Sequence, residues 1–213
     1  MALPKINTVL YDLELPSSGK QVEYRPFLVR EEKILLMALE GKDDKDMSKA
    51  IKQIITQCVT SEGFNVNKLA MIDLEYLFLN IRGKAVGDIS TISFEHECGE
   101  IIKLDIDLSK VEVVQNKNSS DLVEITDDIM VRLSPPGIDD VIGTGNKNQI
   151  DLVMEIIRNS LLEIIQGEEI FSAQDHTKKE LDEFVNSLNS GQFKKLQDYY
   201  ESLPKMKQDI EYT

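Results

Sequence analysis

The residues best suited to chemistry are His96 and Cys98, which flank Glu97 in a short polar segment. A cysteine thiolate and a histidine nitrogen are both zinc ligands, but a structural zinc site uses four ligands, usually supplied as two close pairs. The remaining candidates, Cys58 and His176, lie far from this segment in the sequence. We therefore predict no metal and no other cofactor, and we interpret the segment as a hairpin tip. A metal-binding module or metal-dependent enzyme that uses His96, Cys98 and nearby acidic residues is the alternative interpretation.

Acidic residues also occur at spacings that could hold a metal. Asp105 and Asp107 alternate along a predicted strand and share one face, as the paired carboxylates of a metal-dependent phosphodiesterase would. No third carboxylate or histidine follows at a suitable spacing, and alternating acids are typical of the solvated face of a half-buried strand. The pairs Asp127-Asp128 and Asp139-Asp140 are interpreted as residues of a turn and of a helix start.

Sequence motifs of known catalytic sites are absent. The chain contains no G-x-S-x-G, G-x-x-x-x-G-K-[ST], G-x-G-x-x-G or H-E-x-x-H segment. Gly143-Thr-Gly145 is similar to part of a phosphate-binding loop but lacks the Lys-Ser/Thr pair. Cys58 lies on a predicted apolar helix stripe, where a free cysteine behaves as a small core residue. The sequence therefore predicts a protein that is not an enzyme.

The charge of the chain excludes two classes of partner. Its 213 residues include 24 Lys+Arg and 38 Asp+Glu, which gives a net charge of −14. Non-specific binding to nucleic acid and docking on anionic lipid both need clustered basic residues, so neither is predicted. The first residues lack the apolar core of a signal peptide, no stretch is long enough to span a membrane, and the two cysteines form no disulfide framework. These features predict an acidic protein of the cytoplasm.

Apolar periodicity predicts an α+β fold. The turn cluster Pro16-Ser-Ser-Gly19 separates two short apolar runs, which predicts an N-terminal hairpin over residues 8–27. Helical spacing of apolar residues follows in three segments. These predicted helices cover residues 31–40, 46–59 and 67–82. The third is apolar on nearly every side, which is typical of a buried helix.

Two further hairpins are predicted from apolar alternation with a period of two. Residues 89–95 and 101–108 give a central hairpin near 89–108, with apolar residues on one face and charged residues on the other. The next hairpin occupies residues 122–133 and turns at a pair of aspartates. Together with the N-terminal hairpin, these segments supply the β part of the predicted fold.

The last third of the chain is predicted to be helical. An apolar stripe over residues 150–165 has helical spacing, and Thr177-Lys-Lys-Glu180 is a capping box that opens the next helix. A final helix ends near Pro204, because the residue before a proline disfavours helical geometry.

The division into domains is predicted from the polar segment 115–120. As a linker, this segment would separate an N-terminal part, residues 1–114, from a C-terminal part, residues 121–213. One compact α+β unit is nearly as compatible with the sequence.

Apolar residues near the C-terminus are a candidate binding surface. Tyr199, Tyr200, Leu203 and Met206 form a cluster that exceeds what a terminal helix needs for its own packing. Aromatic residues and methionine are enriched in interface cores, so we predict that these residues bind a partner. The alternative, that they form an intramolecular core helix, stays open.

Three segments of the chain resemble one known family. They are residues 24–38, residues 73–78 with the following Ile81-Arg82 and Val86-Gly87, and residues 202–206 leading to Tyr212. Their order and spacing are similar to those of the baseplate hub protein, or hub assembly chaperone, of T-even-type contractile-tailed bacteriophages, and the similarity covers most of the chain. The resemblance implies a protein without enzymatic activity that builds the central hub of the tail baseplate and binds other hub proteins.

The resemblance also implies a location and a surface. A hub protein would lie in the host cytoplasm during assembly and, as a resident subunit, in the baseplate of the virion. A transient chaperone and a resident subunit both stay open, as does the oligomeric state. Tyr24, Arg25 and Phe27 lie in the first similar segment and are predicted to belong to a partner-binding surface.

One departure from the family pattern concerns the metal. Related proteins often carry a Cys-x-x-Cys pair in the central hairpin, whereas this chain keeps Cys98 beside His96. If the family hairpin is similar to a zinc ribbon, this copy has lost ligands, and its apolar face would hold the hairpin instead.

Overall fold

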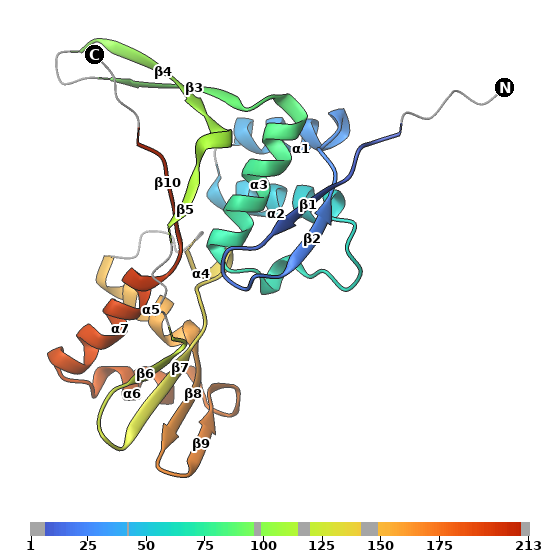
Figure 1. Cartoon of the computed structure of the whole chain (residues 1–213). Helices are drawn as coiled ribbons and strands as arrows, with labels where there is room; N and C mark the ends of the chain where they lie inside the picture. Colours follow the sequence, from blue (N-terminus) through green and yellow to red (C-terminus); the bar gives the residue numbers. More distant parts are fainter. Residues whose placement is uncertain (1–6, 42, 96–98, 115–119, 142–148, 210–213) are drawn as a thin grey trace. The chain divides into compact units, whose positions relative to one another are not determined.

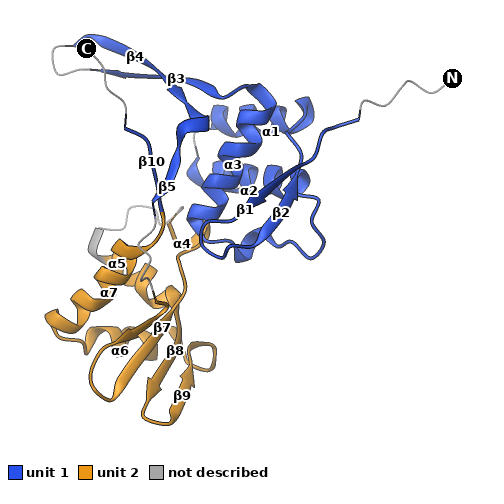
Figure 2. Cartoon of the chain, viewed as in Figure 1, with its two compact units in different colours: residues 1–114, 205–213 blue, residues 115–204 orange. Residues whose placement is uncertain are grey.

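The structure is a computed structural model that describes residues 7–41, 43–95, 99–114, 120–141 and 149–209. Small antiparallel sheets and several helices make up the fold, so the predicted α+β class is confirmed (Figure 1). The chain divides into two compact units (Figure 2). Unit 1 comprises residues 1–114 and 205–213, and unit 2 comprises residues 115–204.

Unit 1 opens with the predicted N-terminal hairpin. Strand β1 (Tyr11–Glu14) pairs antiparallel with β2 (Gln21–Tyr24). The turn between them includes Gly19 at φ +66°, a left-handed conformation that glycine adopts without a steric penalty. Leu15 and Val22 are buried and direct the hairpin toward the helices of the unit.

The helices of unit 1 follow the predicted segments closely. They are α1 (Val29–Gly41), α2 (Asp44–Cys58) and α3 (Met71–Val86), with the 3-10 helix η1 (Val66–Lys68) before α3. Helix α2 starts at Asp43, whose side chain accepts a hydrogen bond from the N–H of Lys45 at 2.9 Å. Helix α3 ends at Gly87, which has a φ of +117°.

The core of unit 1 takes one face from each helix and the inner side chains of the hairpin. In α2 the buried apolar residues recur at helical spacing, as predicted. Helix α3 buries Leu74, Leu77 and Ile81 and leaves most of its other apolar side chains half-buried. The buried apolar residues are Leu15, Val22, Tyr24, Phe27, Ala38, Ala50, Ile54, Ile55, Cys58, Val66, Ala70, Leu74, Leu77 and Ile81.

The central hairpin and one further strand pair complete unit 1. Strands β3 (Ile89–Glu95) and β4 (Ile101–Asp107) pair antiparallel, as predicted. The 3-10 helix η2 (Leu108–Lys110) leads into β5 (Glu112–Val114), which pairs with β10 (Lys205–Lys207). Strand β10 therefore belongs to unit 1, although the linker prediction grouped it with the C-terminal part.

Unit 2 is built on a four-stranded antiparallel sheet whose strand order follows the chain. Its strands are β6 (Leu122–Glu124), β7 (Ile129–Leu133), β8 (Leu161–Gln166) and β9 (Glu169–Ser172). Its helices are α4 (Ile138–Val141), α5 (Gln149–Ser160), η3 (Ala173–Asp175), α6 (Lys178–Asn186) and α7 (Ser190–Ser202). The predicted capping box is present, since the side chain of Thr177 and the side chain of Glu180 each accept the other residue's backbone N–H at the start of α6.

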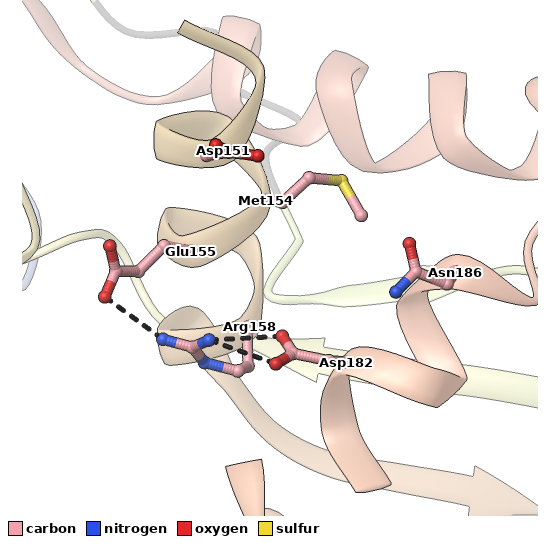
Figure 3. A pocket seen from close by; sticks show the side chains of 6 residues that line it. All are labelled: Asp151, Met154, Glu155, Arg158, Asp182 and Asn186. Atoms are coloured by element: carbon pink, nitrogen blue, oxygen red, sulfur yellow. Dashed lines mark hydrogen bonds and ion pairs between the residues drawn. The ribbon is translucent and has the colours of Figure 1, made fainter. Parts of the chain in front are cut away.

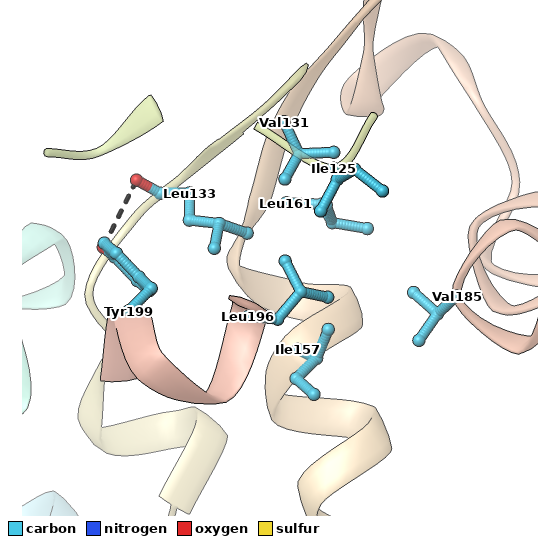
Figure 4. Packing of buried hydrophobic residues seen from close by; sticks show 8 residues of the cluster. All are labelled: Ile125, Val131, Leu133, Ile157, Leu161, Val185, Leu196 and Tyr199. Carbon is cyan, nitrogen blue, oxygen red and sulfur yellow. Dashed lines mark hydrogen bonds between the residues drawn. The ribbon is translucent and has the colours of Figure 1, made fainter. Parts of the chain in front are cut away.

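The core of unit 2 lies where the sheet meets α5, α6 and α7 (Figure 4). Leu196 of α7 is fully buried among side chains of β7 and α5. The Tyr199 hydroxyl donates a hydrogen bond to the carbonyl of Leu133 at 3.4 Å, which satisfies a polar group inside the cluster. The buried cluster consists of Ile125, Val131, Leu133, Ile157, Leu161, Val185, Leu196 and Tyr199.

The expectation of an entirely helical last third was wrong for β8 and β9. Helix α5 ends at Ser160, and the chain continues as a strand in which Ile164 is opposite both Val131 of β7 and Phe171 of β9. The turn between β8 and β9 uses Gly167 at φ +58°. The apolar stripe keeps helical spacing past residue 160, but β-branched isoleucines suit a strand that can pair on both edges.

Unit 2 is expected to be removable without unfolding unit 1. Val114 and Lys205 are directly opposite in the β5–β10 pair, which is the spacing that a two-residue hairpin turn closes. A chain that joins residue 114 to residue 205 through Asn-Gly should keep the hydrogen-exchange protection that α2 and α3 have in the full chain, measured in parallel. Loss of that protection would contradict the division into two compact units.

Candidate functional site

The first predicted binding residues lie inside unit 1. Tyr24 ends β2 and is 2% exposed, and its ring centroid lies 5.7 Å from that of Tyr11. Burial raises the pKa of Tyr24 to about 12. Arg25 and Phe27 are buried as well. In this chain, all three side chains make intramolecular contacts in the core rather than an accessible surface.

Arg25 belongs to a buried ion pair with Glu31, whose side chain is fully buried. Arg25 Nη2 donates to Glu31 Oε1 at 3.0 Å and to the carbonyl of Gln57 at 2.9 Å. Glu31 also accepts from Arg30 Nε at 2.6 Å and from the N–H of Leu28 at 2.7 Å. Burial alone would raise the pKa of Glu31, but these hydrogen bonds outweigh it and lower the pKa from 4.5 to about 2. The network joins the residue that follows β2 to α1 and α2.

Asp73 lies in the second segment that resembles the family, residues 73–78, and it also connects elements of unit 1. It is buried in the first turn of α3, where its Oδ1 accepts a hydrogen bond from the N–H of Ser17 at 2.8 Å. Its Oδ2 accepts the hydroxyl of the same serine. Burial raises the pKa of Asp73 despite these hydrogen bonds. This contact connects the turn of the N-terminal hairpin to α3. The first and the second of the segments that resemble the family therefore both stabilise the fold of unit 1.

The residues predicted to bind a partner near the C-terminus are divided between the two units. Tyr199, Tyr200 and Leu203 pack in or against the core of unit 2, where the two tyrosine rings meet edge to face with centroids 5.1 Å apart. Burial raises the pKa of both tyrosines, that of Tyr200 to about 12. Met206 lies in β10 of unit 1, opposite Val113. The intramolecular interpretation accounts for the contacts of Tyr199, Tyr200 and Leu203.

The residues considered for metal binding do not assemble into a site within the described chain. His96 and Cys98 lie outside the described residues. Cys58 is fully buried beside Arg25, and burial raises the pKa of its thiol to about 11. The ring of His176 is tilted by 53° relative to that of Phe171, with centroids 6.2 Å apart. Within the ranges that the structure describes, no group of three or more His, Cys, Asp or Glu side chains could hold a metal ion.

The acidic pairs serve local structure. Asp105 accepts a hydrogen bond from the Thr91 hydroxyl at 2.6 Å across the central hairpin. Asp107 caps η2 by accepting from the N–H of Ser109, and it also accepts the Ser109 hydroxyl, which lowers the pKa of Asp107. Asp128 accepts from the side chain of Gln166 at 3.2 Å.

Asp140 serves the same purpose in α4, where its Oδ2 accepts from the N–H of Gly137 at 2.8 Å. Its Oδ1 accepts from the side-chain amide of Asn159 at 3.0 Å. Both contacts stay within unit 2, so the predicted turn and helix-start acids hold local geometry.

One cavity of unit 2 is lined by charged side chains of α5 and α6 (Figure 3). It has a volume of about 420 Å³ and is lined by Asp151, Met154, Glu155, Arg158, Asp182 and Asn186. Arg158 donates to Asp182 at 3.1 Å and to Glu155 at 3.2 Å, so its charge is already matched by two carboxylates. The Arg158–Asp182 ion pair connects α5 to α6, whereas the Arg158–Glu155 pair lies within α5.

A second cavity of unit 2, of about 300 Å³, is mainly apolar. It lies between the sheet and α6 and is lined by Ile129, Ile164, Gln166, Phe171, His176, Glu180, Leu181 and Phe184. His176 Nδ1 lies 4.0 Å from Glu180 Oε2, a carboxylate that the capping box already uses. The lining residues of this second cavity include no serine, threonine or cysteine.

The most distinctive surface of unit 1 is the outward side of α1. Val29, Leu36 and Leu39 are 79%, 54% and 54% exposed and recur at helical spacing, and we call these three residues the α1 apolar face. The sequence analysis placed candidate partner-binding residues just before α1, at Tyr24, Arg25 and Phe27, and did not distinguish exposed from buried apolar residues within the helix. A signal was present, since residues 34–39 are all apolar and such a run extends around the whole helix.

Comparisons with known proteins identify the family. No helix in the described part of the chain is long and apolar enough to cross a membrane. Comparison with curated proteins and comparison with solved structures gave no match. A family model described as T4 bacteriophage base plate protein matches residues 8–213, which is nearly the whole chain. The chain therefore belongs to the T4 bacteriophage base plate protein family.

Proposed function

We propose that this protein is a non-enzymatic structural or assembly protein of the baseplate hub, and that it binds other hub subunits through the α1 apolar face. Membership of a baseplate family supports a structural role in the phage tail. We choose this surface because the apolar side chains of Val29, Leu36 and Leu39 are exposed. A protein with this role would meet its partners in the host cytoplasm and act at the tail baseplate.

The α1 apolar face exposes apolar side chains where a solvated helix face would carry polar ones. Contiguous exposed apolar side chains, rimmed by charged ones, mark binding surfaces on soluble proteins. Glu32, Lys33 and Glu40 are exposed on the same side of α1 and supply that rim. On the opposite side, Glu31 and Ala38 are buried, so the helix is already held to the unit and need not move to bind.

Co-expression with the other hub proteins of the same phage tests this proposal. A stable complex on size-exclusion chromatography is expected for the natural sequence. Leu36→Lys should weaken it at least about tenfold, because a charge replaces an apolar interface residue. The new lysine lies four residues from both Glu32 and Glu40, so helix α1 should remain folded.

Ile170→Lys is the matched control, since Ile170 is an exposed apolar residue of unit 2. It should leave the complex intact. Failure to form a complex with any hub protein, or equal loss with both variants, would contradict binding through the α1 apolar face.

Mass spectrometry of purified virions distinguishes the two forms that the role can take. A resident subunit should be found in the particle in fixed proportion to other baseplate proteins. An assembly chaperone should be present in infected cells and missing from the virion. Either result agrees with a hub role, whereas a fixed proportion to capsid proteins in tailless particles would contradict it.

A further inference from the structure

The β3–β4 hairpin is a two-stranded sheet whose outer edges are unpaired in the part of the chain that the structure describes. The two strands contact mainly each other, and Figure 1 shows them extending from the end of α3. An isolated two-stranded hairpin is marginally stable in water, whereas three or more strands with an apolar face can be stable. A further strand on one edge would therefore stabilise this hairpin.

The register of the hairpin separates an apolar face from a polar face. Ile92 lies opposite Leu104 on one face, and Thr91 lies opposite Asp105 on the other. The apolar face consists of Ile92, Phe94, Ile102, Leu104 and Ile106. Ile92 is exposed and the other four are half-buried, so the face is incompletely covered.

The backbone groups at the free edge of β4 belong to alternate residues. The N–H of Leu108 donates to the carbonyl of Asp88 at 2.7 Å, which makes these two residues a hydrogen-bonded pair of the ladder. Because hydrogen-bonded and non-hydrogen-bonded pairs alternate, Leu104 is bonded toward β3. Lys103 and Asp105 therefore direct their N–H and C=O groups to the free edge.

The sequence of β4 is self-complementary for antiparallel pairing. In the stretch Ile-Lys-Leu-Asp-Ile, residues 102–106, the two isoleucines are symmetric about Leu104, and Lys103 and Asp105 have opposite charges at equal spacing. Two copies paired antiparallel about Leu104 place Lys103 of each copy opposite Asp105 of the other. The apolar faces of both copies then lie on the same side of the sheet.

Other registers are less favourable. A shift by two residues places either two Lys103 or two Asp105 side chains opposite each other, and directly opposite like charges destabilise a sheet. A shift by one residue turns the apolar face of one copy to the polar side of the other. Of these registers, the one centred on Leu104 is the one that pairs Lys103 with Asp105 and keeps both apolar faces on the same side.

We infer that β4 pairs with β4 of a second copy of this chain, antiparallel and centred on Leu104. The two hairpins then form one four-stranded sheet with strand order β3-β4-β4-β3 and a two-fold axis through its centre. A lysine in an edge strand normally discourages pairing. Here Lys103 of each copy lies opposite Asp105 of the other copy, so the lysine charge favours this pairing. The contact does not use the α1 apolar face, so it is independent of the proposed hub interface.

Charge exchange tests this pairing by sedimentation equilibrium of the full chain at physiological ionic strength. The natural sequence should form a reversible dimer. Lys103→Asp and Asp105→Lys each place like charges opposite each other at both symmetric pairs. Each should therefore raise the dimer dissociation constant at least about tenfold. The double variant Lys103→Asp/Asp105→Lys should restore it, and an equimolar mixture of the two single variants should form a heterodimer.

Both side chains are exposed, so circular dichroism should show the same fold in all variants. A natural chain that stays monomeric at every concentration tested would overturn the inference. A dimer whose dissociation constant is the same in the single variants would also overturn it, because that dimer would use another surface.

A cross-link tests the register. The two Leu104 residues would form a non-hydrogen-bonded pair with Cα atoms about 4.5 Å apart, within the range that a disulfide spans. Leu104→Cys in a Cys98→Ser background should cross-link under mild oxidation, since the remaining Cys58 is fully buried. Ile102→Cys should cross-link much less, because Ile102 would lie opposite Ile106 of the other copy. Equal cross-linking of the two variants would overturn the register.

Discussion

Replacing Glu31 by glutamine should lower the free energy of unfolding of unit 1 by about 3 kcal/mol, because it breaks a buried ion pair from one side. The Glu31 side chain is fully buried and accepts hydrogen bonds from Arg25, Arg30 and the N–H of Leu28. Without the carboxylate, the buried guanidinium of Arg25 keeps its desolvation penalty and loses its counter-charge. Urea denaturation followed by circular dichroism measures the change.

Two variants control for this effect. Glu32→Gln removes the same charge from the neighbouring exposed position and should change the free energy of unfolding by about 0.5 kcal/mol or less. Arg30→Ala removes the partner whose side chain is 67% exposed, and its cost should be about 1 kcal/mol or less. Equal losses in Glu31→Gln and Glu32→Gln would contradict a special role for the buried pair.

The contribution of Glu31 should disappear in acid. The pKa of Glu31 is lowered from 4.5 to about 2 on folding, so the folded state favours the carboxylate. The free energy of unfolding therefore falls as the pH is lowered. The contribution is complete above about pH 5 and is lost as the pH falls toward the folded pKa. The difference in stability between the natural chain and Glu31→Gln should therefore shrink over this range, while groups common to both proteins cancel. A constant difference from pH 7 to pH 2 would contradict the assignment.

Replacing Leu196 by alanine should lower the free energy of unfolding of unit 2 by about 2 to 5 kcal/mol, through lost apolar burial and the cavity that remains. Leu196 is fully buried at the centre of the cluster that joins the sheet to α5 and α7 (Figure 4). The neighbouring side chains come from different elements and cannot all close the gap. Hydrogen exchange should show the loss in the amides of β7 and β8.

Leu162→Ala is the matched control, because Leu162 lies in the same unit and is 40% exposed. This variant should lower the free energy of unfolding by about 1 kcal/mol or less, because it loses less buried apolar area than Leu196→Ala does. If the two alanine variants were equally destabilised, Leu196 would not be the centre of the core.

The local elements of this fold could be predicted because their signals lie within a few residues. Thr177 and Glu180 are three positions apart, and the capping box that they form starts α6. The alternation in β3 and β4 needs only the period of a strand. The central hairpin therefore follows from its own sequence, as do the ranges of α1, α2 and α3 to within a few residues.

Features that depend on what lies opposite in space could not be predicted in the same way. Leu161, Ile164 and Ile165 continue the helical stripe of α5, yet β8 forms because β7 and β9 offer backbone partners on both edges. Tyr24 and Arg25 have residue types found at interfaces, but the packing of β2 against α1 and α2 makes them core residues.

The sequence alone determined the α+β class, most of the local elements, the lack of catalytic motifs and the resemblance to baseplate hub proteins. Only the tertiary structure decided which apolar residues are covered: it buries Phe27 and exposes Val29, Leu36 and Leu39 of the next helix. The physical reason is that spacing fixes which side chains share a face, whereas burial depends on which other element packs on that face. For this protein, the candidate binding surface is therefore the part of the sequence pattern that the fold leaves uncovered.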